Sequence, residues 1–289
     1  MSLAKLDRRP SRSRQTDRRH GQRARKPSSA SSVEPPQMAA NGGRKYVYSI
    51  ISATDKGRFT MPVGRASQAG LHAVDYRDIA AVVSDALPEM HEPTRANMLA
   101  HERVNTALIS RYTVIPVSFG TVFKTRDDVV ELLHCAYEVL REALDDMRDK
   151  VEFGLKVLWD RETTMREIEA SDEALVRLRN ALSSRAGSSY LGRVQYGRLI
   201  DAALELRCER YVAEILERMQ RVALDARPKK PLGDKMILNA AYLVSRARES
   251  EFEAALEELG RAHDELTLKF SGPWPPYNFV DIRLSLNSR

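Results

Sequence analysis

The sequence predicts an α+β protein of two domains, and three observations support this class. Segments with a two-residue apolar alternation occur among longer segments with helical apolar spacing, which indicates strands and helices in one chain. The 289 residues are enough for two domains of ordinary size. The composition, with 43% hydrophobic and 30% charged residues, is normal for a globular protein. We therefore expect helices packed on small antiparallel or mixed sheets.

The first domain is predicted over residues 45–150, with its elements in the order β-β-α-β-α-β if the strand at the boundary is included. These elements are strands over 46–51 and 79–83, a helix capped by Thr94 and ending near 111, a strand over 114–119, a helix over 129–147 and a strand over 151–159. The first strand is apolar on both faces, so we expect both faces to be covered. The nearest standard topology is a ferredoxin-like sheet with helices on one face.

The second domain is predicted over residues 151–289 and is richer in helix. Its elements are a helix over 165–182, a long helix over 200–222, a strand over 236–244, a short helix over 252–263 and a final strand over 266–270. The strand over 236–244 is apolar on both faces and is predicted to be central, whereas the strand over 151–159 is expected at an edge or shared with the first domain. His263 continues an apolar stripe and is interpreted as a hydrogen-bonded residue at the rim of the core.

Residues 1–44 are predicted to form a disordered basic tail. They carry eleven Lys and Arg residues against three acidic residues, a net charge of +8, whereas the rest of the chain carries 35 basic and 37 acidic residues. The tail has few large apolar side chains, so it cannot bury enough surface to offset the entropy of ordering. An arginine-rich arm of this kind suits nucleic acid or an acidic protein surface. A solvated extension without a partner is the alternative.

The sequence contains no pattern that indicates catalysis, a cofactor or a metal. His101-Glu102 begins like a zinc-protease helix, but Asn105 stands where the second histidine should be. There is no Cys-x-x-Cys pair, phosphate-binding glycine loop or nucleophile elbow. We therefore expect no enzyme activity, no cofactor and no metal. No apolar run approaches the ~20 residues that span a bilayer, and no secretory signal is present, so a cytoplasmic protein without a membrane segment is predicted.

The segment Ser271–Phe279, which we call the ledge, has three prolines and three aromatic residues in nine positions. Proline fixes φ, removes an amide donor and restricts the preceding residue to extended geometry. We therefore expect a stiff extended segment. Two interpretations stay open: a rigid lid whose rings cap the core, or a docking surface for a partner. The candidate contact residues are Trp274, Pro275, Pro276, Tyr277 and Phe279.

Seven short blocks, spread over roughly residues 45–283, occur in the order known from one protein family. The blocks are Tyr46–Ile50, Ala80–Ser84, Leu99–His101, Ile115–Phe123, Ser189–Leu191, Ala240–Val244 and Gly272–Phe279. Together they resemble the gas vesicle protein F/L family. The sequence departs from this family at Ser118, where a basic residue is frequent, and in the tail, which is not part of the family core.

The resemblance implies a non-enzymatic assembly factor and minor component of gas vesicles. Such a protein would bind the very hydrophobic major shell protein, limit its aggregation and help to nucleate the vesicle, together with other accessory gas vesicle proteins. Apolar surface on unassembled shell subunits could be covered by a groove or by strand addition. The alternative function is nucleic-acid binding through the tail, and an enzyme on a ferredoxin-like scaffold is a third possibility that fold alone does not exclude.

Overall fold

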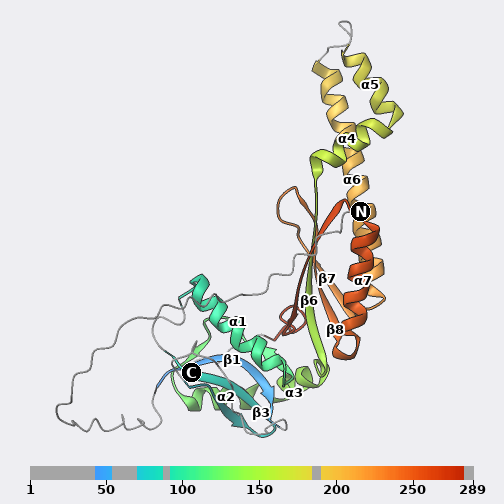
Figure 1. Ribbon diagram of the computed structural model, residues 1–289. Helices are drawn as coiled ribbons and strands as arrows, with labels where there is room; N and C mark the ends of the chain where they lie inside the picture. Colours follow the sequence, from blue (N-terminus) through green and yellow to red (C-terminus); the bar gives the residue numbers. More distant parts are fainter. Residues whose placement is uncertain (1–42, 54–69, 87–91, 184–189, 283–289) are drawn as a thin grey trace, which may run out of the picture.

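The computed structural model describes residues 43–53, 70–86, 92–183 and 190–282, which form two antiparallel sheets with helices packed on them (Figure 1). The α+β class is therefore confirmed. Of the tail predicted to be disordered, residues 1–44, all but Gly43 and Arg44 lie outside the described residues. The division into domains at residue 150 stays a prediction.

The first sheet has the strand order β2-β3-β1-β4, with β5 also paired to β1, and all its neighbouring strands are antiparallel. This order matches a ferredoxin-like sheet. Its strands are β1 (Lys45–Ser52), β2 (His72–Tyr76), β3 (Ile79–Asp85), β4 (Val114–Pro116) and β5 (Val122–Phe123). The helices that follow or interrupt them are α1 (Arg95–Ile109), α2 (Arg126–Cys135) and α3 (Tyr137–Asp146).

Helices cover both faces of the first sheet, rather than the single face expected. Val47 and Ile50 of β1 pack in a cluster with residues of α2 and α3, whereas Tyr46 and Tyr48 pack on the opposite face with residues of α1. A register shift between Val47 and Ser49 lets Val47 and Ile50 share a face. The physical reason is the one visible in the sequence: a strand that is apolar on both faces needs two covering layers.

Side-chain caps explain where α1 and α2 begin, whereas α3 begins without one. The side chain of Thr94 accepts the N–H of Asn97 and caps α1, as predicted. Thr125 and Asp128 form a reciprocal capping box that starts α2. The continuous helix predicted over 129–147 is two helices, because the backbone leaves helical geometry at Ala136 (φ −102°, ψ 11°).

The second sheet has the order β7-β8-β6-β9. Its strands are β6 (Lys150–Trp159), β7 (Asp225–Lys229), β8 (Met236–Ser245) and β9 (Leu266–Trp274). Strand β8 is central, as predicted, and β6 lies between β8 and β9 instead of at an edge. Fully buried rings of Phe153 on β6 and Phe252 on α7 (Glu249–Ala262) stack with centroids 5.3 Å apart. One continuous apolar cluster joins this core to α1 and the adjoining face of the first sheet.

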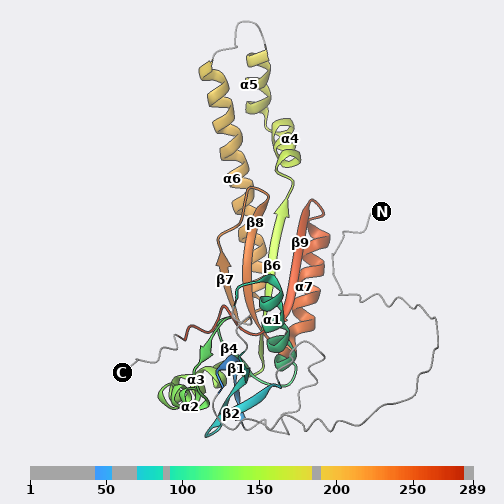
Figure 2. The ribbon, with the colours of Figure 1, turned by 90° about the vertical axis from the view of Figure 1, so that its left-hand side faces the viewer.

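Three helices form an arm that projects from the second sheet, away from the first sheet (Figures 1 and 2). They are α4 (Arg161–Ser171), α5 (Glu173–Ser183) and the amino-terminal half of α6 (Tyr190–Gln220). The helix predicted over 165–182 is broken at Asp172, whose side chain accepts backbone N–H groups at the start of α5. The carboxyl-terminal half of α6 packs with α7 against the second sheet.

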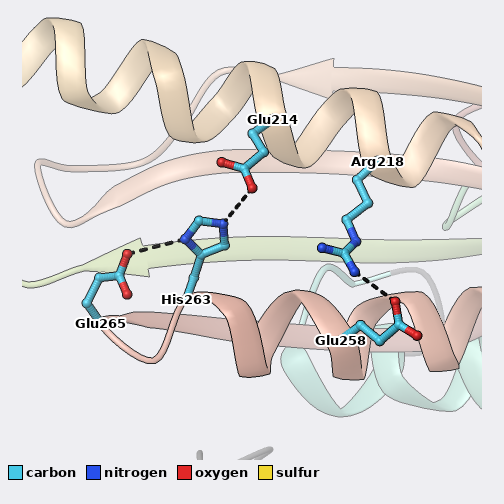
Figure 3. Close-up of polar contacts among 5 residues, drawn as sticks. All are labelled: Glu214, Arg218, Glu258, His263 and Glu265. Carbon is cyan, nitrogen blue, oxygen red and sulfur yellow. Dashed lines mark hydrogen bonds and ion pairs between the residues drawn. The ribbon is translucent and has the colours of Figure 1, made fainter.

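Polar contacts join α6 to α7 and to the start of β9 (Figure 3). The ring nitrogens of His263 lie 3.0 Å from Glu214 Oε1 and 3.3 Å from Glu265 Oε1, and Arg218 donates to Glu258 at 2.7 Å. The side chain of His263 is only 12% exposed. Its predicted position at the rim of the core, with hydrogen-bond partners, is confirmed.

Replacing Gly272 by alanine is expected to destabilise the protein by about 2–4 kcal/mol, from backbone strain and steric overlap. Gly272 has φ +132°, and an added Cβ would lie 2.5 Å from Phe153 Cδ1 and 2.9 Å from the carbonyl oxygen of Glu152. Denaturant titration measures the loss. The matched control is Gly197→Ala on α6, where no atom lies within 4 Å of an added Cβ; it should be neutral or mildly stabilising. Equal stability of the two variants would contradict this account.

Candidate functional site

The ledge is partly strand and partly turn. Its first four residues complete β9, which pairs with β6 as far as the register pair Trp274 and Glu152. Beyond Trp274 the chain turns, with Tyr277 N donating to Pro275 O at 2.7 Å and Phe279 N donating to Pro276 O at 3.1 Å. The extended geometry predicted for the whole ledge therefore holds only to Trp274. Proline at this place is compatible with β9 because β9 is an edge strand.

A buried carboxylate holds the turn in place. Glu152 of β6 is 5% exposed, and its side chain accepts the backbone N–H of Asn278 at 2.7 Å and a second hydrogen bond from the Asn278 side chain. Burial raises the pKa of Glu152 above its usual range, and the bonds from Asn278 oppose that rise. The carboxylate thus leaves water only because the turn supplies N–H donors.

The ring of Phe279 closes the outer face of the second sheet. It is 8% exposed and forms a small apolar cluster with Ala241 and Leu243 of β8, against which Met147 also packs. The guanidinium of Arg227 lies over this ring, 5.0 Å from its centroid, and donates to the carbonyl oxygen of Asn278. At Phe279 the lid interpretation is therefore the one that the packing supports.

Tyr277 connects the ledge to α1. Asn105 of α1 is fully buried, and its Nδ2 donates to the Tyr277 hydroxyl at 2.9 Å. The hydroxyl end of Tyr277 is enclosed, and burial raises the pKa of Tyr277 to about 12. The residue as a whole is nevertheless 40% exposed. The side chain is therefore anchored at its tip while part of the ring faces solvent.

His101 lies one helical turn before Asn105, inside a cage of aromatic rings. Its Nε2 lies 3.1 Å from the carbonyl oxygen of Val117, and its Nδ1 lies 2.9 Å from the Tyr46 hydroxyl. A carbonyl oxygen can only accept, so Nε2 donates to Val117 and Nδ1 accepts from Tyr46. The Tyr46 hydroxyl in turn accepts the N–H of Gly120 at 3.1 Å. Burial lowers the pKa of His101, so the neutral ring is favoured.

The five predicted contact residues differ in exposure. Pro275, Pro276 and Phe279 are buried, and Trp274 is half-buried. Tyr277 is therefore the most exposed of the five. The five residues lie at the end of β9 and in the turn that follows it, and they are buried to different extents.

Two apolar side chains of α1, the helix that contacts Tyr277 through Asn105, are also exposed. Met98 is 51% exposed and lies two turns before Asn105 on the same face of α1, and Leu99 is 39% exposed. Helix α1 also packs against β9. We call Met98, Leu99, Trp274 and Tyr277 the α1–ledge surface. It consists of apolar side chains on a backbone that the buried network holds in place.

Glu152, Asn278 and Met98 are not among the contact residues predicted from the sequence. Glu152 occupies a polar position in an alternating strand, which is the usual pattern for a solvent-facing residue. The one signal that could have found this junction was the pair His101 and Asn105, four residues apart and so on one helix face. In the sequence alone this pair resembles an incomplete zinc motif.

The described residues also bear on metals and membranes. No group of three or more His, Cys, Asp or Glu side chains among them has an arrangement that could hold a metal ion. In the same parts of the chain, no helix combines the length and the apolar character that crossing a bilayer requires.

Acidification is expected to weaken the fold through His101. An unfolded histidine has a pKa of about 6.5, and the pKa of His101 in the folded chain is lower. Below about pH 6.5 the unfolded chain therefore binds a proton at this residue more strongly than the folded chain does. The free energy of unfolding should fall by up to about 1.4 kcal/mol from this residue between pH 7.5 and 5.5. Denaturant titrations at both pH values measure it.

The control for this measurement is His101→Gln, which keeps a donor and an acceptor but does not titrate. Glu152, whose raised pKa gives a contribution of opposite sign as pH falls, is present in both proteins and cancels in the difference. An identical pH dependence of the two proteins would show that His101 is not the titrating group.

Comparison with known proteins agrees with this architecture. The family model described as gas vesicle synthesis protein GvpL/GvpF matches residues 44–281. Gas vesicle protein F2 of Halobacterium salinarum is 30% identical over 242 residues, covering 83% of this chain and 93% of the relative. Gas vesicle protein F of a Streptomyces species is 33% identical over 203 residues, covering 70% of this chain and 84% of the relative.

A solved structure is similar to most of this chain. The crystal structure of GvpF from Anabaena sp. superposes with a TM-score of 0.73 at 23% identity, covering 84% of this chain and 100% of that one. At this identity the likeness shows the fold. Since the family model covers both sheets, the arm and the ledge, the chain belongs to the GvpL/GvpF family of gas vesicle synthesis proteins.

Proposed function

We propose that this protein is an assembly factor and minor component of gas vesicles that binds the hydrophobic major shell protein. In this role it limits aggregation of the shell protein, helps to nucleate the vesicle and meets other accessory gas vesicle proteins. The observation that supports the proposal is the family match over residues 44–281, which includes the ledge. Membership of the family supports a role in gas vesicles. The α1–ledge surface is the place that we propose for the contact with the shell protein.

The α1–ledge surface has the properties of a contact for an apolar partner. Met98, Leu99 and Tyr277 are each between 39% and 51% exposed, although apolar side chains gain by leaving water. The ring of Tyr277 is held at its hydroxyl by Asn105, so it would lose little conformational freedom on binding. Rigid aromatic side chains of this kind are frequent among residues that dominate binding energy.

We propose that the role is non-enzymatic. The titratable groups at the junction already have structural partners: Glu152 accepts from Asn278, and His101 bonds Tyr46 and Val117. A general acid or base needs a free path to a reacting atom. Here the protons and lone pairs are used to hold the ledge on β6 and to hold α1 against Tyr46 and Val117.

Co-purification with the major shell protein tests the proposal. The double variant Met98→Lys, Tyr277→Ser should retain at least tenfold less shell protein, because it removes two apolar contacts and places a charge in the surface. Thermal melting must show that the fold survives, since the Tyr277 hydroxyl bonds Asn105. The matched control is Leu232→Ser, which removes a 71% exposed leucine from the β7–β8 loop.

The outcomes separate the surface from the function. Wild-type retention by the folded double variant would remove the α1–ledge surface from the proposal. Failure of the unaltered protein to bind the shell protein or reduce its aggregation would overturn the proposed function itself.

The second candidate function is nucleic-acid binding through residues 1–44, favoured by their net charge of +8. A chain lacking these residues should then lose most of its affinity for DNA or RNA. The affinity of the full chain should fall steeply with salt, because each phosphate contact releases counterions. Filter binding at several salt concentrations measures both effects. A flat salt dependence would remove this candidate.

A further inference from the structure

The outward face of α6 in the arm carries a row of exposed apolar side chains. Leu191, Leu199 and Leu206 are 76%, 43% and 56% exposed, and Ala202 is also exposed. Leu199 and Leu206 are seven residues apart, with Ala202 between them, so these three lie along one side of the helix. We call Leu199, Ala202 and Leu206 the outer stripe.

The opposite face of α6 is already used inside the arm. Ile200 and Leu204 are buried in the cluster that includes Ile168 of α4 and Leu175 of α5. The Tyr196 hydroxyl donates to Glu169 at 2.6 Å. On the flank, Arg161 pairs with Asp201 at 2.8 Å. The helices of the arm therefore bury the inner face of α6 and leave the outer stripe exposed.

The spacing along the outer stripe is that of a coiled-coil seam. If Leu199 and Leu206 occupy a positions, Ala202 occupies a d position, and large and small side chains alternate. Arg198 and Glu205 then occupy successive g positions beside the seam. They are seven residues and about 10 Å apart on the same helix, too far to pair with each other. Among the described residues, no ion pair joins either of them to the rest of the chain.

We propose that the outer stripe binds the outer stripe of a second copy of this chain, with the two α6 helices antiparallel. In this register Leu199 packs against Ala202 of the second copy. Arg198 then meets Glu205 of the second copy, and the two-fold axis repeats the pair. The charge pattern is thus self-complementary, as an isologous contact requires. A parallel register would instead place Arg198 beside an alanine.

The shape of the molecule permits this contact. The arm projects away from both sheets (Figures 1 and 2), so antiparallel arms place the two bodies at opposite ends. The overlap of residues 192–209 spans about 27 Å of helix. A contact between two single helices of that length is at the small end of specific interfaces. The association is therefore weak in dilute solution and grows where copies are concentrated. It leaves the α1–ledge surface free.

Charge reversal tests the proposal on the full chain. Sedimentation velocity over a concentration series should show reversible dimerisation of the unaltered protein. Arg198→Glu alone and Glu205→Arg alone should each weaken dimerisation roughly tenfold or more, because each creates two like-charge contacts. The double variant, and an equimolar mixture of the two single variants, should restore it. Val139→Glu, which alters a 50% exposed residue of α3, should have no effect.

Three results would overturn the inference. These are a monomer at every concentration, single variants that dimerise normally, and a mixture of single variants that fails to recover. Leu206→Glu gives an independent readout, since a charge in the seam should abolish dimerisation while circular dichroism stays unchanged. The mixture distinguishes this contact from damage to the fold, because misfolded variants could not complement each other.

Discussion

The junction between the two sheets depends on the burial of one carboxylate. Glu152 leaves water near the start of β6, and the cost of that transfer is offset by N–H groups that the returning chain end supplies. The same turn places Phe279 on β8 and Tyr277 on Asn105 of α1. A polar contact and an apolar contact therefore hold the ledge on the second sheet, and Tyr277 fixes it to the helix of the first.

Around this point the two sheets share one core. The side chain of Arg246, just after β8, donates to the carbonyl of Ile109 at the end of α1, and the apolar cluster continues through α1 from one sheet to the other. Such sharing ties α1 and the second sheet to one core, which supports the contact that we propose for the α1–ledge surface. The arm differs from the junction, because its outer face carries exposed leucines together with charged side chains. The α1–ledge surface and the arm therefore differ in the side chains that they expose.

Much of the fold could be predicted from the sequence, because it rests on periodicity and local signals. The alternation in β6, the two-sided apolar character of β1 and β8, and the Thr94 cap are properties of neighbouring residues. Breaks at Ala136 and Asp172 were missed, since the apolar stripe continues across both and a stripe does not report backbone angles. The helical layer on the second face of the first sheet follows from the two-sided apolar character of β1. It was not predicted, because the ferredoxin-like topology has helices on one face only.

The sequence by itself determined the class of the fold, the central position of β8 and the extended geometry of the ledge as far as Trp274, because contiguous residues specify each of them. Only the tertiary structure decided which residues that end contacts. Glu152 and Asn278 are 126 positions apart, and Asn105 and Tyr277 are 172 apart. A buried pair of that kind leaves no local pattern, since its energy comes from desolvation and geometry that exist only once both sheets have formed.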